Sequence, residues 1–290
     1  MKTKIVIVLL VLGFTCLSGC QDSKTTEQKQ ESTVENKEEK EKAEMQVYRT
    51  PTEKEMEILE GCNLSSDYMK EIQEKGMSVS VQSFVDTAQI MLDYLGEKYE
   101  EEFVVKGGEI PGIISGDYMI FAAATTGEYA GERFEVYYRV DEEGKGYCED
   151  GYFAILKRME VQEYLQNIAK EAGTDIKVIV SLHGRVGKEY DKETTIEEMV
   201  SLGREIEVYI FGYMRPEITE DEFTEQTVRL QNKFAETGFY LDYTVFRLAS
   251  GEKFDELKEY RDIRRVFPKE MKSEEKYDLR YYEYVRPSGE

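Results

Sequence analysis

The feature that most constrains the fold is the alternation of apolar and polar residues in the segments that favour strands. In residues 134–140, Phe134, Val136, Tyr138 and Val140 alternate with Glu135, Tyr137 and Arg139, so that the strand is half-buried with one apolar face. Further strands are expected at residues 118–126, 176–182, 206–213, 240–248 and 279–285. Strands with one polar face favour antiparallel or mixed sheets over a doubly wound parallel sheet.

Helices are expected between these strands. Residues 83–99 place Phe84, Ala88, Met91 and Leu95 on one face at the helical period. Other helices are expected at residues 159–172, at residues 252–265, and after the capping boxes Thr195–Glu198 and Thr219–Glu222. The sequence therefore predicts an α+β fold, with antiparallel or mixed sheets and helices packed on one face.

Composition divides the chain into a linker and two folded regions. Residues 20–45 contain no aromatic residue and no Gly and are densely charged, which predicts a disordered linker. We expect residues 46–150 to form a helix plus an antiparallel meander. We expect residues 151–290 to form a second α+β domain of alternating helices and strands.

The first residues are typical of a secretory signal. Lys2 and Lys4 precede an uninterrupted apolar run at residues 5–14, and small residues precede Cys20. The apolar run is too short for a membrane-spanning helix. We therefore expect residues 1–19 to be a signal peptide that is removed.

Leu17-Ser18-Gly19-Cys20 resembles the lipobox of bacterial lipoproteins at all four positions. The resemblance implies that Cys20 receives a diacylglyceryl thioether, and that acyl chains such as palmitate anchor the protein to the outer side of the cell membrane. The alternative is an ordinary signal peptide with a chance Cys at the cleavage site. The passage at residues 94–105 also resembles small uncharacterised exported proteins of Gram-positive bacteria, which implies an uncharacterised Gram-positive lipoprotein family.

The charge of the chain limits its partners. The formal net charge is −22, and loss of Lys2 and Lys4 with the signal makes it more negative. Nucleic acid would be repelled by such a chain, so we expect no nucleic-acid partner. The expected partners are the membrane, through the lipid anchor, and an envelope protein or peptide.

Two cysteines remain in the expected folded regions. Cys62 and Cys148 could form one disulfide in an exported protein, although nothing in the sequence places them together. Two Cys residues and the lone histidine, His183, are too widely spaced for a structural zinc site. We expect neither a metal nor a cofactor.

The chain lacks the common catalytic signatures. There is no Gly-x-Ser-x-Gly motif beside which His183 could serve as a base, and the Gly-Lys pair at residues 187–188 fails the phosphate-loop pattern at two positions. We assign no catalytic residue. Whether the protein is an enzyme stays open, with a non-enzyme favoured.

Tyrosines in the strands suggest a contact surface. Tyr209, Tyr213, Tyr282 and Tyr284 lie in strand segments where part of the side chains must face outward. The alternative is that they pack within the sheets.

Three functions follow as hypotheses. The first is a membrane-anchored lipoprotein of the cell envelope that binds a partner without catalysis. The second is a small-ligand or transporter-accessory receptor, which a closed pocket would favour. The third is an envelope hydrolase with an unrecognised acidic site, which a cleft with facing carboxylates or His183 would favour.

Overall fold

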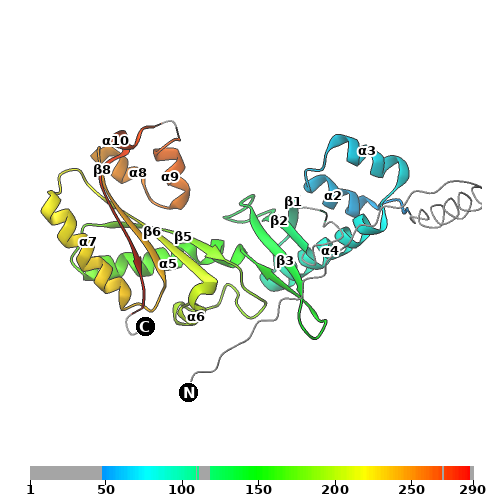
Figure 1. Cartoon of the computed structure of the whole chain (residues 1–290), viewed down its shortest axis with the longest axis horizontal. Coiled ribbons are helices and arrows are strands. Elements are labelled where there is room, and N and C mark those ends of the chain that lie inside the picture. Colours follow the sequence, from blue (N-terminus) through cyan, green and yellow to red (C-terminus); the bar gives the residue numbers. More distant parts are fainter. Residues whose placement is uncertain (1–47, 109, 111–117, 270, 288–290) are drawn as a thin grey trace, which may run out of the picture. The chain divides into compact units, whose positions relative to one another are not determined.

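The structure is a computed structural model that describes residues 48–108, 110, 118–269 and 271–287. The chain splits into two units, Met1–Gln46 and Val47–Glu290, and the second is the folded body (Figure 1). The expected signal peptide, Cys20 and linker lie outside the described residues. The body is α+β, as predicted, with one antiparallel and one mixed sheet.

The first sheet is an antiparallel meander in the order β1-β2-β3-β4. Its strands are β1 (Phe103–Gly108), β2 (Tyr118–Ala124), β3 (Phe134–Val140) and β4 (Gly146–Asp150). The helices that precede it are α2 (Glu53–Gly61), α3 (Ser66–Lys75) and α4 (Val79–Tyr99). The helical face predicted for residues 83–99 is correct, since Phe84, Ala88, Met91 and Leu95 are all buried against this sheet in one hydrophobic core.

The second sheet is mixed, in the order β5-β6-β7-β8. Its strands are β5 (Lys177–Gly184), β6 (Ile206–Met214), β7 (Leu241–Leu248) and β8 (Tyr277–Val285). Only β6 and β7 are parallel, because α7 (Glu220–Ala235) carries the chain from the end of one to the start of the other. The two predicted capping boxes are present, at the starts of α6 (Ile196–Ser201) and α7; the 3₁₀ turn η1 (Gly203–Glu205) follows α6.

Helices cover the two faces of this sheet unequally. The long helix α5 (Tyr152–Glu171) and α7 bury the main core on one face. On the other face, residues from α9 (Tyr260–Val266) and its flanks form a smaller core with Tyr213 and Phe246. The helix expected at residues 252–265 is interrupted, since Leu257 is extended between α8 (Gly251–Glu256) and α9; the short α10 (Ser273–Lys276) precedes β8. The sequence predicted helices on one face only, whereas α9 and its flanking residues also cover part of the other face of the second sheet.

Helix α5 begins seven residues earlier than the expected 159, directly after β4. Its first turn contributes Tyr152 and Ile155 to the core of the first sheet and Phe153 to that of the second. A shared helix therefore follows the domain boundary expected at residue 150, and the division into two domains stays a prediction. Within the described residues, no helix combines the length and apolar character that crossing a bilayer requires.

Candidate functional site

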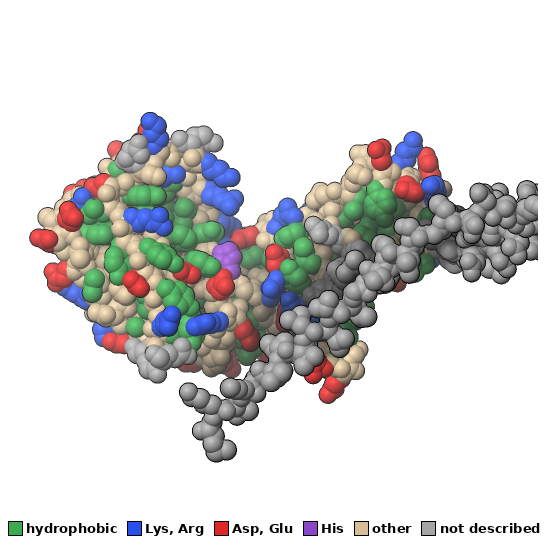
Figure 2. Space-filling model, viewed as in Figure 1, with side chains coloured by type: hydrophobic (Ala, Val, Ile, Leu, Met, Phe, Trp, Pro, Cys, Tyr) green, Lys and Arg blue, Asp and Glu red, His purple; other side chains and the backbone are tan. Residues whose placement is uncertain are grey.

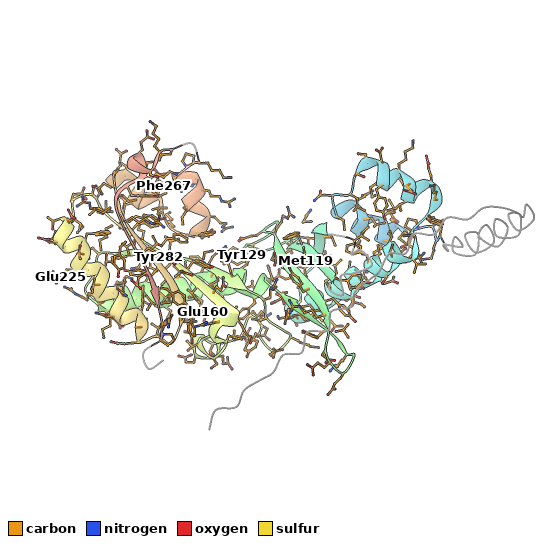
Figure 3. All side chains as sticks on the ribbon, in the orientation of Figure 1. Met119, Tyr129, Glu160, Glu225, Phe267 and Tyr282 are labelled. Carbon is orange, nitrogen blue, oxygen red and sulfur yellow. The ribbon has the colours of Figure 1, made fainter. Side chains whose placement is uncertain are left out.

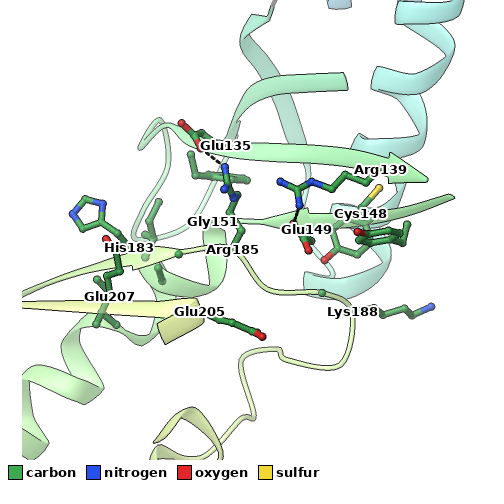
Figure 4. Close-up of a pocket in the computed structure, with 18 of the residues that line it drawn as sticks. Glu135, Arg139, Cys148, Glu149, Gly151, His183, Arg185, Lys188, Glu205 and Glu207 are labelled. Carbon is green, nitrogen blue, oxygen red and sulfur yellow. Dashed lines mark hydrogen bonds and ion pairs between the residues drawn. The ribbon is translucent and has the colours of Figure 1, made fainter. Parts of the chain in front are cut away.

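The main pocket of the described body has a volume of about 1180 Å³ and lies between β3–β4 and the end of β5 (Figure 4). This volume is slightly above that of ordinary ligand sites, which are roughly 300–1,000 Å³. The start of α5, the loop after β5 and a few residues of α4, η1, β6 and α9 also line it. The pocket is therefore the main candidate binding site.

The pocket concentrates basic side chains within an acidic protein. The chain has 38 Lys and Arg against 60 Asp and Glu. The charged lining residues are Arg133, Arg139, Lys145, Arg158, Arg185, Lys188 and Arg204, with Glu132, Glu135, Glu149, Glu189, Glu205 and Glu207. Seven cations against six anions make the pocket nearly neutral, so that it would not repel an anionic ligand as the rest of the surface would.

Part of this charge is already paired, once across the pocket and once between the neighbouring strands β3 and β4 of one wall. Arg185 lies 3.1 Å from Glu135, and Arg139 lies 3.6 Å from Glu149 (Figure 4). Both pairs are partly exposed, so they contribute little to stability and can exchange partners. A charged or strongly polar ligand could therefore replace one member of either pair.

An aromatic side chain lies beneath these cations. The guanidinium of Arg185 is 4.2 Å from the ring centroid of Tyr137, and that of Arg139 is 5.4 Å from it. Stacking on an aromatic face holds a guanidinium flat and leaves its N–H groups directed sideways. The two arginines are thus presented as donors rather than left as free chains.

A buried polar cluster holds the two walls together. The Asp150 carboxylate accepts hydrogen bonds from Tyr99 and Tyr94, both at 2.8 Å, and from Lys98 at 2.7 Å. Lys98 also donates to the Gly187 carbonyl at 2.7 Å. The cluster therefore ties α4 and β4 to the loop after β5.

Burial sets the protonation behaviour of this cluster. Burial lowers the pKa of Lys98, and the neighbouring Asp150 carboxylate opposes that shift. Burial and the same carboxylate raise the pKa of Tyr94 and Tyr99 well above the usual 10. Both phenols consequently stay protonated and act as donors.

The backbone also joins the walls. Asp150 and Val186 exchange two backbone hydrogen bonds of 3.1 Å, an isolated antiparallel bridge. Gly184 ends β5 with a φ of 136°, and a Cβ there would lie 2.3 Å from the Glu205 carbonyl oxygen. Glycine at this position lets the chain leave β5 and run toward β4.

His183 lines the pocket rather than standing alone in a loop. It is the penultimate residue of β5, and its Nε2 lies 2.9 Å from the Ser181 hydroxyl. Partial burial lowers the pKa of His183 below the usual 6.5, so the ring is mainly neutral at pH 7. The cross-strand neighbour Glu207 accepts a hydrogen bond from Tyr209 instead.

This Ser–His contact lacks the other parts of a nucleophilic site. Ser181 is only 3% exposed, so a substrate carbonyl could not reach its hydroxyl. Within the described residues, no carboxylate is hydrogen-bonded to the His183 ring. A triad needs both an accessible nucleophile and an oriented base.

The two cysteines stay apart. The structure has Cys62 and Cys148 as free, buried thiols and not as the disulfide that the sequence left open. Burial raises the pKa of Cys62 to about 12 and that of Cys148 to about 11. Cys148 lines the pocket, but a thiol that stays protonated is a poor nucleophile.

The expected tyrosine surface is only partly present. Tyr282 and Tyr284 are 57% and 37% exposed, and Tyr209 is half-buried. Tyr213 is 2% exposed, because its ring stacks on Phe246 and on Phe267 at the end of α9. Its inclusion in an exposed surface was wrong. Figure 3 labels Phe267 and Tyr282, which mark the covered and the open part of this face.

The open part of the sheet is also not a continuous apolar surface. Tyr282 donates a hydrogen bond to Asp242 across the strands at 2.8 Å. On the face shown in Figure 2, hydrophobic side chains are interspersed with charged ones. Such a mixed surface gives less support for docking than the pocket does.

No metal centre emerges from the described part of the chain, where no group of three or more His, Cys, Asp or Glu side chains could hold an ion. Cys20 lies outside the described residues. Sequence reasoning missed Glu135, Arg139, Arg185 and Asp150. Alternation placed Glu135 and Arg139 on one polar strand face, but no pattern linked them to Arg185, which lies about fifty residues further along.

Comparisons with known proteins do not identify the function of this site. No family model matches the chain, and no curated protein matches it. Among solved structures, the chain is similar to a DUF5037 family protein from Ruminococcus gnavus ATCC 29149, with 14% identity and a TM-score of 0.36. That match covers 70% of this chain and 92% of the other. The site is therefore interpreted from its own geometry.

Proposed function

We propose that the protein is a membrane-anchored extracytoplasmic lipoprotein whose body is a non-catalytic binding module of the cell envelope. The lipobox ending at Cys20 supports the anchor, and the charged residues 20–45 supply a spacer. The binding site is the pocket between β3–β4 and the end of β5. The observation that carries this assignment is its two partly exposed Arg–Glu pairs, whose guanidinium groups both lie over the ring of Tyr137.

These pairs suit reversible binding better than catalysis. Each carboxylate of the two pairs is already matched by a guanidinium of the protein. A ligand with its own charges can take over one partner while the other keeps a counter-charge nearby. The pocket is open to solvent, which favours a partner's segment over a fully enclosed small ligand.

The anchor is tested with Cys20→Ala in a bacterial host that processes lipoproteins. We expect loss of labelling by a palmitate analogue and release of the protein from membranes. Retention of Cys20→Ala on membranes would overturn the lipoprotein assignment.

The binding site is tested by cross-linking on living cells, followed by mass spectrometry of the captured material. A specific partner should be lost with Arg185→Glu, which puts two like charges beside each other at Glu135. Arg229→Glu is the matched control, because Arg229 pairs with Glu225 on the exposed side of α7, away from the pocket. Equal capture by both variants would move the binding site elsewhere.

An envelope hydrolase is the second candidate, favoured by the 2.9 Å contact between Ser181 and His183 within the pocket. The burial of Ser181 weighs against it. Hydrolysis of p-nitrophenyl acetate that disappears in both Ser181→Ala and His183→Ala would favour this candidate over a binding module.

A further inference from the structure

Strand β4 is the last strand of its sheet, and its free edge faces the pocket. At the two ends of its ladder with β3, Gly151 N–H donates to the Glu135 carbonyl and Asp141 N–H donates to the Lys145 carbonyl. Bonded residues in an antiparallel pair alternate with non-bonded ones. The odd-numbered residues of β4 therefore bond to β3, and the even-numbered ones direct their N–H and C=O groups to the free edge.

The protein itself occupies only one position on that edge. Asp150 is paired with Val186 through two backbone hydrogen bonds. The next two outward positions, Cys148 and Gly146, have no backbone partner among the residues that the structure describes. A strand edge with unpaired backbone N–H and C=O groups can pair with another strand.

The pocket runs beside β4 in the place that an added fifth strand of the first sheet would occupy. It is lined by residues 145–149, which include all of β4 except Asp150. It reaches Tyr138 and Cys148, on the face of the sheet that packs on the core, and also Arg139 and Glu149 on the opposite face. A strand added beside β4 would send alternate side chains toward these two faces.

Gly146 keeps the outer end of this edge open. Its backbone lies against the ring of Tyr138, and a Cβ at this position would come within 2.0 Å of the Tyr138 hydroxyl oxygen. Glycine leaves no side chain to cover the N–H and C=O groups. Lys145 and Lys188 also line the pocket, and no ion pair within the described residues uses either ammonium.

We propose that this pocket binds an extended acidic peptide segment of another protein by strand addition to β4, continuing the ladder begun by Val186. This rests on the proposed function and specifies its ligand. Backbone hydrogen bonds to Gly146 and Cys148 hold the segment, and carboxylates of the peptide meet Lys145 and Lys188. The nearly neutral pocket is where an acidic segment can approach this acidic chain.

The probe is a phage-displayed library of random ten-residue peptides, selected on the mature chain. We expect the selected peptides to be rich in Asp and Glu. A synthetic copy is then N-methylated at one residue at a time. Methylation should weaken binding by roughly tenfold or more at alternate residues and have little effect at those between them, because only alternate N–H groups face β4.

The protein side has a matching readout in amide exchange measured by NMR. Peptide binding should slow exchange at Gly146 and Cys148. The amides of Tyr147 and Glu149, which already face β3, should change little. A peptide that binds without this alternation, on itself or on β4, would refute strand addition.

Failure of strand addition and failure of the proposed site give different results. Arg185→Glu could abolish peptide binding while N-methylation weakens binding without alternating along the peptide. The pocket would then still be the binding site, but strand addition to β4 would be refuted. If Arg185→Glu binds the peptide as well as Arg229→Glu does, both the pocket as the binding site and strand addition to β4 are refuted. Absence of any selected peptide overturns the proposal, as does a dimer of the protein that slows the same two amides, since the occupant is then a second copy.

Discussion

The ammonium of Lys98 lies 2.7 Å from the carboxylate of Asp150, and the two side chains are 1% and 0% exposed. Lys98 comes from α4 and also donates to the Gly187 carbonyl. Asp150 ends β4 and accepts the backbone N–H of Tyr152, the first residue of α5. This ion pair thus joins four segments, namely α4, the loop after β5, β4 and the start of α5, and it positions the strand edge that lines the pocket.

Lys98→Met should lower the free energy of unfolding by about 3–5 kcal/mol. The substitution leaves the Asp150 carboxylate buried without a cation, which costs far more than the pair itself is worth. Equilibrium unfolding in urea, followed by circular dichroism, measures the loss. Lys192→Met is the matched control, because the Lys192–Glu100 pair is largely exposed and its loss should leave the stability nearly unchanged. Equal stability of the two variants would contradict this account.

Local patterns were enough to predict most of the elements. The apolar face of α4 and the capping boxes of α6 and α7 depend on residues three or four apart, and the structure confirms them. The first turn of α5 was missed, because its N-terminal N–H groups are accepted by Asp150, which the sequence assigned to the preceding strand region. A cap supplied from the end of a strand leaves no helix signature.

The candidate site could not be predicted in the same way. Arg185 meets Glu135 only because Gly184 turns the chain toward β4 and Asp150 pairs with Val186. These contacts join residues 50 and 36 positions apart, and periodicity carries no information at such separations. The burial of Tyr213 was missed for a similar reason, since its cover comes from Phe267.

Tyr213→Ala should cost about 3–5 kcal/mol of unfolding free energy. The ring lies in the smaller core and stacks on Phe246 and Phe267, so its removal leaves a cavity. Tyr282→Ala tests the open part of the same face, where the side chain is 57% exposed, and should barely move the unfolding midpoint. Thermal unfolding of the two variants measured side by side decides whether α9 covers this face.

Cys62 and Cys148 should be unreactive thiols in the native protein. Their raised pKa values, about 12 and about 11, leave almost no thiolate at pH 8, and both side chains are buried. In a chain that begins at Gln21, and so lacks Cys16 and Cys20, we expect DTNB to react slowly with the native protein and to titrate Cys62 and Cys148 promptly in urea. A chain that shows no thiol in urea until a reductant is added would instead contain the disulfide.

The acid sensitivity of the N-terminal helices should depend on Glu55. Its pKa is lowered from the usual 4.5 to about 2, first by hydrogen bonding to Arg49 and then by Thr52, whose N–H it accepts at 2.7 Å. A carboxyl with a lowered folded pKa stabilises the protein above its unfolded pKa, so this contribution is complete above pH 4.5 and is lost as the pH falls toward 2.

Glu55→Gln removes this contribution at every pH, at a cost near pH 7 of about 1 kcal/mol, the usual size of a lost helix cap. Its urea unfolding curve should therefore change less between pH 5 and pH 2 than that of the parent chain. Arg49→Met removes the largest cause of the shift while keeping the carboxyl, so its acid-induced loss should be smaller than in the parent and should end at a higher pH. Identical pH profiles for the parent and both variants would show that this carboxyl does not set the acid response.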